Sequence, residues 1–182
     1  MNAIKSLSII LLFTACTKST PKVVKAPKIP ESTAFFNFDE VTHYKLDNNV
    51  ETEAISRARN EDPNVPKIFR IFWSFSNYPA RLNDSAFFKD LDKMYINEGK
   101  ISADKLPEIS DIFSERKVES MTSTTCEPMY RDILIFKKNG IVTGISKLCF
   151  QCGEHYMIGA KRNTEMFGQN GEFQRLENLF KK

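Results

Sequence analysis

The sequence predicts an α+β fold, in which helices are followed by an antiparallel sheet with a central hairpin and a C-terminal helix. The hairpin is indicated by Asn139-Gly140, which joins two runs of strand-forming residues at 130–137 and 141–150. The helices are indicated by apolar residues that recur at helical spacing before and after these runs. The chain has 182 residues, enough for one domain, and its 15 Phe can form a substantial core.

The N-terminus has the pattern of an export signal. Lys5 precedes a short apolar run at 7–13, which is too short to cross ~30 Å of hydrocarbon as a helix. Ala15-Cys16 follows, and small residues before a cysteine resemble the lipobox of bacterial lipoproteins, although Phe13 stands where that motif usually has Leu. We therefore expect residues 1–15 to be a signal peptide and Cys16 to carry a lipid (palmitate) anchor.

Residues 16–31 are rich in lysine and proline and have no apolar face. Such chain favours extended polyproline conformations at ~3.1 Å per residue, so this stretch could reach about 45 Å. The composition predicts a solvated tether between the lipid and a single globular domain at 32–182.

The domain begins with a predicted strand over 34–46, where apolar and aromatic side chains alternate with polar ones. A helix is expected over 50–59. The run 67–75 is apolar nearly throughout, and its spacing fits a strand or a helix entered at Pro66 equally well.

Two helices are expected next. Asn83, Asp84 and Ser85 are good N-caps before one helical face, and Gly99 stands where that helix should stop. The second helix is capped near Ser102 or Asp104 and tolerates Pro107 in its first turn. The two apolar faces consist of Phe87, Phe88, Leu91, Met94 and Tyr95 in the first helix, and of Leu106, Ile109, Ile112 and Phe113 in the second.

After the hairpin, residues 156–158 can add a third strand. A C-terminal helix over 172–180 is predicted by inward-facing apolar residues at helical spacing, which are Phe173, Leu176, Leu179 and Phe180.

A cysteine cluster is the strongest candidate for chemistry, and a structural disulfide is its favoured interpretation, because exported cysteines usually oxidise. With a three-residue loop, Lys137 pairs with Ile141 and Cys126 falls opposite Cys152; a two-residue loop puts Cys126 one residue out of step. In both registers Cys149 lies roughly 10 Å from Cys126, beyond the ~7 Å between Cα atoms that a disulfide allows. We therefore expect a Cys126–Cys152 disulfide, with Cys149 left over.

Three other interpretations of the cluster stay open. Cys149 and Cys152 could instead close a disulfide with each other. Cys126, Cys149, Cys152 and His155 could form a Cys₃His zinc site, since the CxxC at 149–152 is followed by Gly153 as in zinc ribbons. The same CxxC could instead be redox-active, although no helix is expected to begin there and lower the thiol pKa.

No other constellation indicates catalysis, and no catalytic residue is assigned. His43 falls on the polar face of the first strand, so we expect a solvated side chain there. The formal charge of +3 gives no basic excess of the kind that nucleic-acid-binding domains have. The seven Gly form no phosphate-binding loop.

The chain resembles a family of uncharacterised lipoproteins of the Bacteroidota. The resemblance rests on Phe38-Asp39-Glu40-Val41 with Tyr44, on Cys126 with Arg131-Asp132, and on 147–152, 163–164 and 167–169. It implies an envelope location and a shared cysteine core, and it brings no activity.

Together these features predict a lipid-anchored protein of the cell envelope that faces the periplasm and acts as a binding or structural module. Its expected partners are the membrane, through the anchor, and a protein or small molecule of unknown identity. Thiol–disulfide redox chemistry or zinc binding at the CxxC cluster is the alternative.

Overall fold

The computed structural model describes residues 33–59, 67–73, 77–118 and 125–181, and residues 32–182 form one compact unit. The predicted signal peptide at 1–15, Cys16 and the tether at 16–31 lie outside the described residues. Within the described ranges, no helix combines the length and apolar character that crossing a membrane requires.

The predicted α+β class is confirmed. Five strands form one antiparallel sheet in the order β2-β1-β3-β4-β5. The strands are β1 (Glu40–Leu46), β2 (Tyr95–Lys100), β3 (Asp132–Lys138), β4 (Ile141–Cys149) and β5 (Glu154–Ile158).

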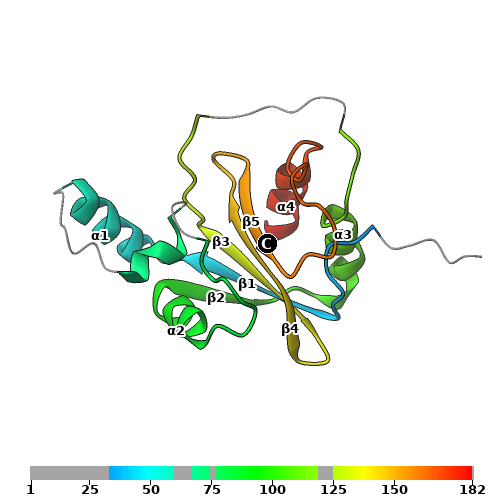
Figure 1. Ribbon diagram of the computed structural model, residues 1–182, viewed down its shortest axis with the longest axis horizontal. Helices are drawn as coiled ribbons and strands as arrows, with labels where there is room; N and C mark the ends of the chain where they lie inside the picture. Colours follow the sequence, from blue (N-terminus) through cyan, green and yellow to red (C-terminus); the bar gives the residue numbers. More distant parts are fainter. Residues whose placement is uncertain (1–32, 60–66, 74–76, 119–124, 182) are drawn as a thin grey trace, which may run out of the picture. The chain divides into compact units, whose positions relative to one another are not determined.

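The α-helices form two groups on the sheet. They are α1 (Asn48–Arg59), α2 (Ser85–Met94), α3 (Leu106–Ile112) and α4 (Glu172–Phe180), with short 3-10 helices η1 (Lys67–Ile71) and η2 (Ala103–Lys105). Helices α3 and α4 lie next to each other, away from α1 and α2 (Figure 1). Two apolar cores result, one on each face of the sheet.

The core under α3 and α4 is rich in aromatic rings. Phe136 of β3 stacks on Phe36 at 4.3 Å between ring centroids, and Phe113 stacks on Phe167 at 5.0 Å. Such pairs contribute roughly 0.5–1.5 kcal/mol beyond the area that they bury. The apolar faces predicted for α3 and α4 pack into this core as expected.

The core on the other face joins η1 and α2 to the sheet. It holds Phe72, Phe87 and Leu91, which are fully buried against Ile133 and Ile145 of the central hairpin. Asp84 caps α2 by accepting hydrogen bonds from the Ala86 and Phe87 amides at 3.0 and 3.1 Å, which confirms the predicted start of this helix.

The hairpin forms where the sequence predicts it, but its register differs from the one that favoured the disulfide. Asn139 and Gly140 both have positive φ, at 50° and 79°, as a two-residue turn of this handedness requires. Lys138 therefore pairs with Ile141, and a bulge after Phe136 shifts the remaining pairs by one more residue.

The predicted strand at 34–46 is shorter and less regular than expected. Only Glu40–Leu46 belongs to the sheet, and Ala34 makes an isolated bridge to Ser114. Phe36 and Phe38 pack in the α3/α4 core, whereas Tyr44 and Leu46 pack in the opposite one. The even-numbered apolar residues thus lie on opposite sides before and within β1, because the residues before Glu40 are outside the ladder and do not follow its alternation.

The sequence misses β2. The first predicted helix ends at Met94, and Tyr95–Lys100 pairs with β1 as an edge strand. Gly99 therefore does not end a helix. It pairs with His43 next to a β-bulge and has a φ of 104°. Helix α3 starts at Leu106, with Pro107 in its first turn as expected, and Ser102 caps η2 without a side-chain hydrogen bond.

The remaining elements fall close to their predicted ranges. The structure gives a helix over Asn48–Arg59 and the C-terminal helix over Glu172–Phe180. It resolves the ambiguous run at 67–75 as the 3-10 helix η1, followed by a bridge from Trp73 to Met129, while residues 74–76 lie outside the described part.

Candidate functional site

A cavity of about 530 Å³ lies on the α3/α4 side of the sheet, where β1 and β2 meet the C-terminal end of α4. Its floor is formed by His43 and Asp132, and its apolar wall by Phe150, Leu179 and Phe180. The other lining residues are Lys45, Glu98, Gly99, Lys100, Ile101, Ser102, Lys105, Glu177 and Lys181.

His43 and Asp132 form a buried pair on this floor. His43 Nε2 lies 2.7 Å from Asp132 Oδ1, and each residue is 9% exposed. In the ladder His43 faces Leu134 and Lys45 faces Asp132, so the two side chains are diagonal neighbours on one face of the sheet. The carboxylate fixes the orientation of the imidazole and engages one of its two nitrogens.

The expectation of a solvated His43 is wrong. Phe180, the last residue of α4, stacks on the imidazole with 4.2 Å between ring centroids and 18° between planes. The helix that covers His43 comes more than a hundred residues later, so the pattern around the first strand could not reveal it.

In the part of the chain that the structure describes, Asp132 is the side chain hydrogen-bonded to the His43 ring. Among the residues that the structure describes, no hydroxyl or thiol donates a hydrogen bond to the His43 ring. Ser102 borders the cavity, but its side chain makes no cap hydrogen bond and is exposed. The arrangement can orient a bound group and exchange a hydrogen bond with it.

Lysines of three elements border the cavity. Lys105 Nζ donates to the Leu179 carbonyl at 3.0 Å and so ties η2 to the end of α4. Lys100 pairs with Glu40, and this ammonium is the main reason that the pKa of that carboxyl is below its usual value. Lys45 is exposed beside the floor, opposite Asp132 in the ladder.

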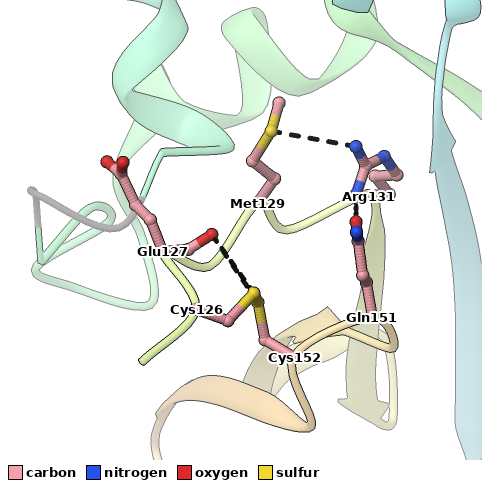
Figure 2. The surroundings of a disulfide bond; sticks show 6 residues. All are labelled: Cys126, Glu127, Met129, Arg131, Gln151 and Cys152. Carbon is pink, nitrogen blue, oxygen red and sulfur yellow. Dashed lines mark hydrogen bonds between the residues drawn. A yellow bond between two sulfur atoms is a disulfide. The ribbon is translucent and has the colours of Figure 1, made fainter. Parts of the chain in front are cut away.

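The cysteine cluster lies elsewhere, at the turn between β4 and β5. Cys126 and Cys152 form a disulfide with their Cα atoms 5.7 Å apart, and Cys152 Sγ lies 3.6 Å from the Glu127 carbonyl (Figure 2). Cys149 is free and buried. The arrangement is compatible with the pairing expected from the sequence.

That pairing does not arise from the register that suggested it. β3 begins at Asp132 and β4 ends at Cys149, so both bonded cysteines lie beyond the ladder. The segment before β3 is held instead by the Trp73–Met129 bridge and by Tyr130 N, which donates to the Phe72 carbonyl at 2.8 Å. Arg131 contacts Met129 and Gln151 beside the disulfide (Figure 2).

The four residues of the possible zinc site do not converge. His155 pairs with Leu148 in the β4–β5 ladder and packs on Phe167, on the α3/α4 side, whereas Cys149 lies in the cluster of Tyr130 and Cys152. Burial lowers the pKa of His155. In the part of the chain that the structure describes, no group of three or more His, Cys, Asp or Glu side chains is placed to hold a metal ion.

Lys147 is a buried charged residue outside the cavity that the sequence analysis did not identify. It is fully buried in β4, and its Nζ donates to the Tyr78 carbonyl at 2.9 Å. The ammonium also lies over the rings of Tyr130 and Tyr156, at 4.7 and 5.2 Å from their centroids. Burial lowers its pKa to about 7. The sequence did contain a signal for this burial. Lys147 is two residues from both Ile145 and Cys149, so in a strand it points to the same face as these two apolar residues.

Comparisons with known proteins add nothing to this geometry: a scan against protein-family models gave no match, and neither did searches of curated proteins and of solved structures.

Proposed function

We propose that this chain is a lipid-anchored protein of the bacterial cell envelope whose globular domain binds a small ligand in the cavity above His43 and Asp132. The observation that carries the proposal is a formed cavity of about 530 Å³ with an oriented, buried His–Asp pair as its floor. Ligand sites in proteins typically enclose about 300–1,000 Å³.

The walls indicate the kind of ligand. Phe150, Leu179 and Phe180 offer an apolar surface, and Phe180 is held in place by its stacking on His43. Few polar groups converge on the floor, which is the usual composition of a site that buries an apolar body and orients one polar group.

The lysines at the border indicate that the ligand is negatively charged. Lys45 and Lys181 are exposed ammonium groups at the cavity, and either can pair with a carboxylate or a phosphate. We therefore propose a small anionic ligand with an apolar, ring-sized body. Glu98 and Glu177 on the same border disfavour ligands with several negative charges.

The envelope location rests on the N-terminal pattern. A short apolar run after Lys5 ends in Ala15-Cys16, and a Pro/Lys-rich stretch separates it from the domain. The resemblance to lipoproteins of the Bacteroidota agrees with this pattern. In this proposal Cys16 carries the lipid, and the domain presents its cavity to the periplasm.

The probe for the cavity is anilinonaphthalene sulfonate, an apolar dye with one negative charge that fluoresces when it is bound. We expect the folded protein to bind it. Lys45→Gln and Phe180→Ala should each raise the dissociation constant by about 5- to 10-fold, which corresponds to roughly 1–1.4 kcal/mol.

Lys161→Gln is the matched control, because Lys161 is exposed and does not line the cavity. Near-UV circular dichroism must show that each variant keeps its tertiary structure, since loosely packed proteins also bind this dye. Equal dissociation constants for the native protein, Lys45→Gln and Phe180→Ala would place the dye elsewhere and contradict the proposal.

A further inference from the structure

Cys152 has two cysteines within reach. Its Cα lies 5.7 Å from that of Cys126, to which it is bonded. Residues 150–153 form the turn between β4 and β5, closed by Gly153 N, which donates to the Cys149 carbonyl at 2.9 Å. This hydrogen bond joins residues four apart, as in one turn of an α-helix. In such a turn Cα atoms three residues apart lie roughly 5–6 Å from each other, a separation that a disulfide allows.

The two cysteines of the CxxC also share one environment. Cys149 and Cys152 are 1% and 5% exposed and pack together with Tyr130 in a single buried cluster. The free thiol thus lies in the same cluster as the sulfur of Cys152, while Cys126 lies on the solvent side of the bond.

Cys126 is well placed to act as the leaving group if the Cys126–Cys152 disulfide is attacked. It is exposed and belongs to neither a helix nor a strand, and its Sγ lies 3.8 Å from the carbonyl of the neighbouring Glu127. From Met129 onward the segment is fixed by the Trp73 bridge and by the Tyr130 hydrogen bonds. Release of Cys126 therefore leaves the packed part of the segment in place.

Charged and titratable groups of both signs lie around Cys149. Arg131 is close enough for a charge on Cys149 to contribute to the raised pKa of its guanidinium. Lys147 lies two residues earlier on the same face of β4, and both Tyr130 and Tyr156 flank its amine. Glu154, which pairs with Cys149 in the ladder, adds an acidic group beside the thiol.

We propose that Cys149 and Cys126 exchange as partners of Cys152. The Cys149 thiolate attacks Cys152 Sγ, a Cys149–Cys152 bond forms, and the Cys126–Cys152 bond breaks. The electron pair leaves with Cys126 Sγ, which takes up the proton that Cys149 released, so one disulfide and one thiol remain. The product buries its disulfide in the turn and exposes a thiol at Cys126 that can attack an external disulfide.

The test is native alkylation of the oxidised full-length protein with N-ethylmaleimide between pH 7 and 9, followed by acid quenching and peptide mapping. Trypsin leaves Cys149 and Cys152 on one peptide that starts after Lys147, so the exchanged product is an internal bond within this peptide. We expect the label on Cys126 together with this internal bond, at a rate that rises up to about tenfold per pH unit while the thiolate fraction limits it.

Two variants separate exchange from local opening. Cys149→Ser should keep the Cys126–Cys152 bond and lower labelling of Cys126 by about tenfold or more, because it removes the attacking thiol. Cys126→Ser should form the Cys149–Cys152 bond on oxidation. Label on Cys149 with the Cys126–Cys152 bond intact, label on neither residue, or two free thiols in Cys126→Ser would each overturn the proposal.

Discussion

Burial of the Lys147 amine costs free energy, because its charged form loses its hydration. Among the described residues Lys147 is the lysine that is completely buried, and no carboxylate pairs with it. The Tyr78 carbonyl and the two tyrosine rings favour the ammonium, whereas loss of hydration disfavours it and dominates. A buried amine of this kind links the stability of the sheet to pH.

The sign of this linkage follows from the two pKa values. In the native protein the pKa of Lys147 is about 7, below the ordinary 10.5 expected in the unfolded chain. Between these values the native amine is neutral and the unfolded one is charged, so unfolding takes up a proton and stability rises with pH, by at most about 1.4 kcal/mol per unit.

We therefore expect Lys147→Met to flatten the pH dependence of unfolding between pH 7 and 9.5. The measurement is urea unfolding of the variant and of its parent, both in a Cys149→Ser background so that thiol exchange does not contribute. The absolute stability of the variant also reflects the Tyr78 carbonyl that loses its donor. The slope of the free energy of unfolding against pH reports on the amine alone. Equal slopes for the variant and its parent would refute the linkage.

At the scale of elements, the segment before β1 holds the α3/α4 core together. Phe35 N donates to the Phe113 carbonyl, Lys161 N donates to the Phe35 carbonyl, and Thr143 Oγ1 donates to the Asn37 carbonyl. These bonds press the Phe36 ring onto β4 at Gly144, where an added Cβ would overlap the ring. Gly144 is thus required by close approach, since its φ is not positive.

Gly144→Ala should lower the free energy of unfolding by about 1–3 kcal/mol through this overlap. The cost should fall in a Phe36→Leu background, where the smaller side chain leaves room for the methyl group. Urea unfolding of the two single variants and the double variant gives the coupling energy. If the changes in the free energy of unfolding were additive, the Phe36 ring and the added methyl group would not be in contact.

Elements with local signals were predictable from the sequence. Asn139-Gly140 fixed the hairpin turn, Asp84 fixed the start of α2, and the spacing of Phe173 to Phe180 fixed α4. β2 carried no such signal, because Tyr95 continues the apolar face of α2, and only its pairing with β1 makes it a strand. Tertiary pairing decides such segments over local preference.

The cavity was not predictable for a related reason. Its floor comes from β1 and β3, its wall from α4 and the turn after β4, and its border from β2 and η2, so no single stretch of sequence holds both the floor and the wall. The Cys126–Cys152 pairing was expected from a hairpin register that placed the two residues opposite each other. The actual register differs, because the bulge after Phe136 and the irregular segment before β3 are set by packing.

At the scale of the whole molecule, the sheet is covered on both faces, and three of the four cysteines lie together in the domain. Cys126 and Cys152 are bonded to each other, and Cys149 is buried beside them. Cys16 is separate in sequence from this cluster and follows the short apolar run. Its proposed role is therefore independent of the cysteine chemistry of the domain.

Cys16→Ser should release the protein from membranes or leave an unprocessed precursor. The apolar run at 7–13 is far shorter than the roughly 20 residues that a spanning helix needs, so stable attachment depends on the lipid. The measurement is fractionation after high-salt and carbonate washing, with intact mass to detect the lipid. Cys149→Ser is the matched control and should stay in the membrane fraction. If Cys16→Ser stayed there as well, after both washes and without the lipid mass, the anchor would lie elsewhere in the chain and the assignment of Cys16 would be wrong.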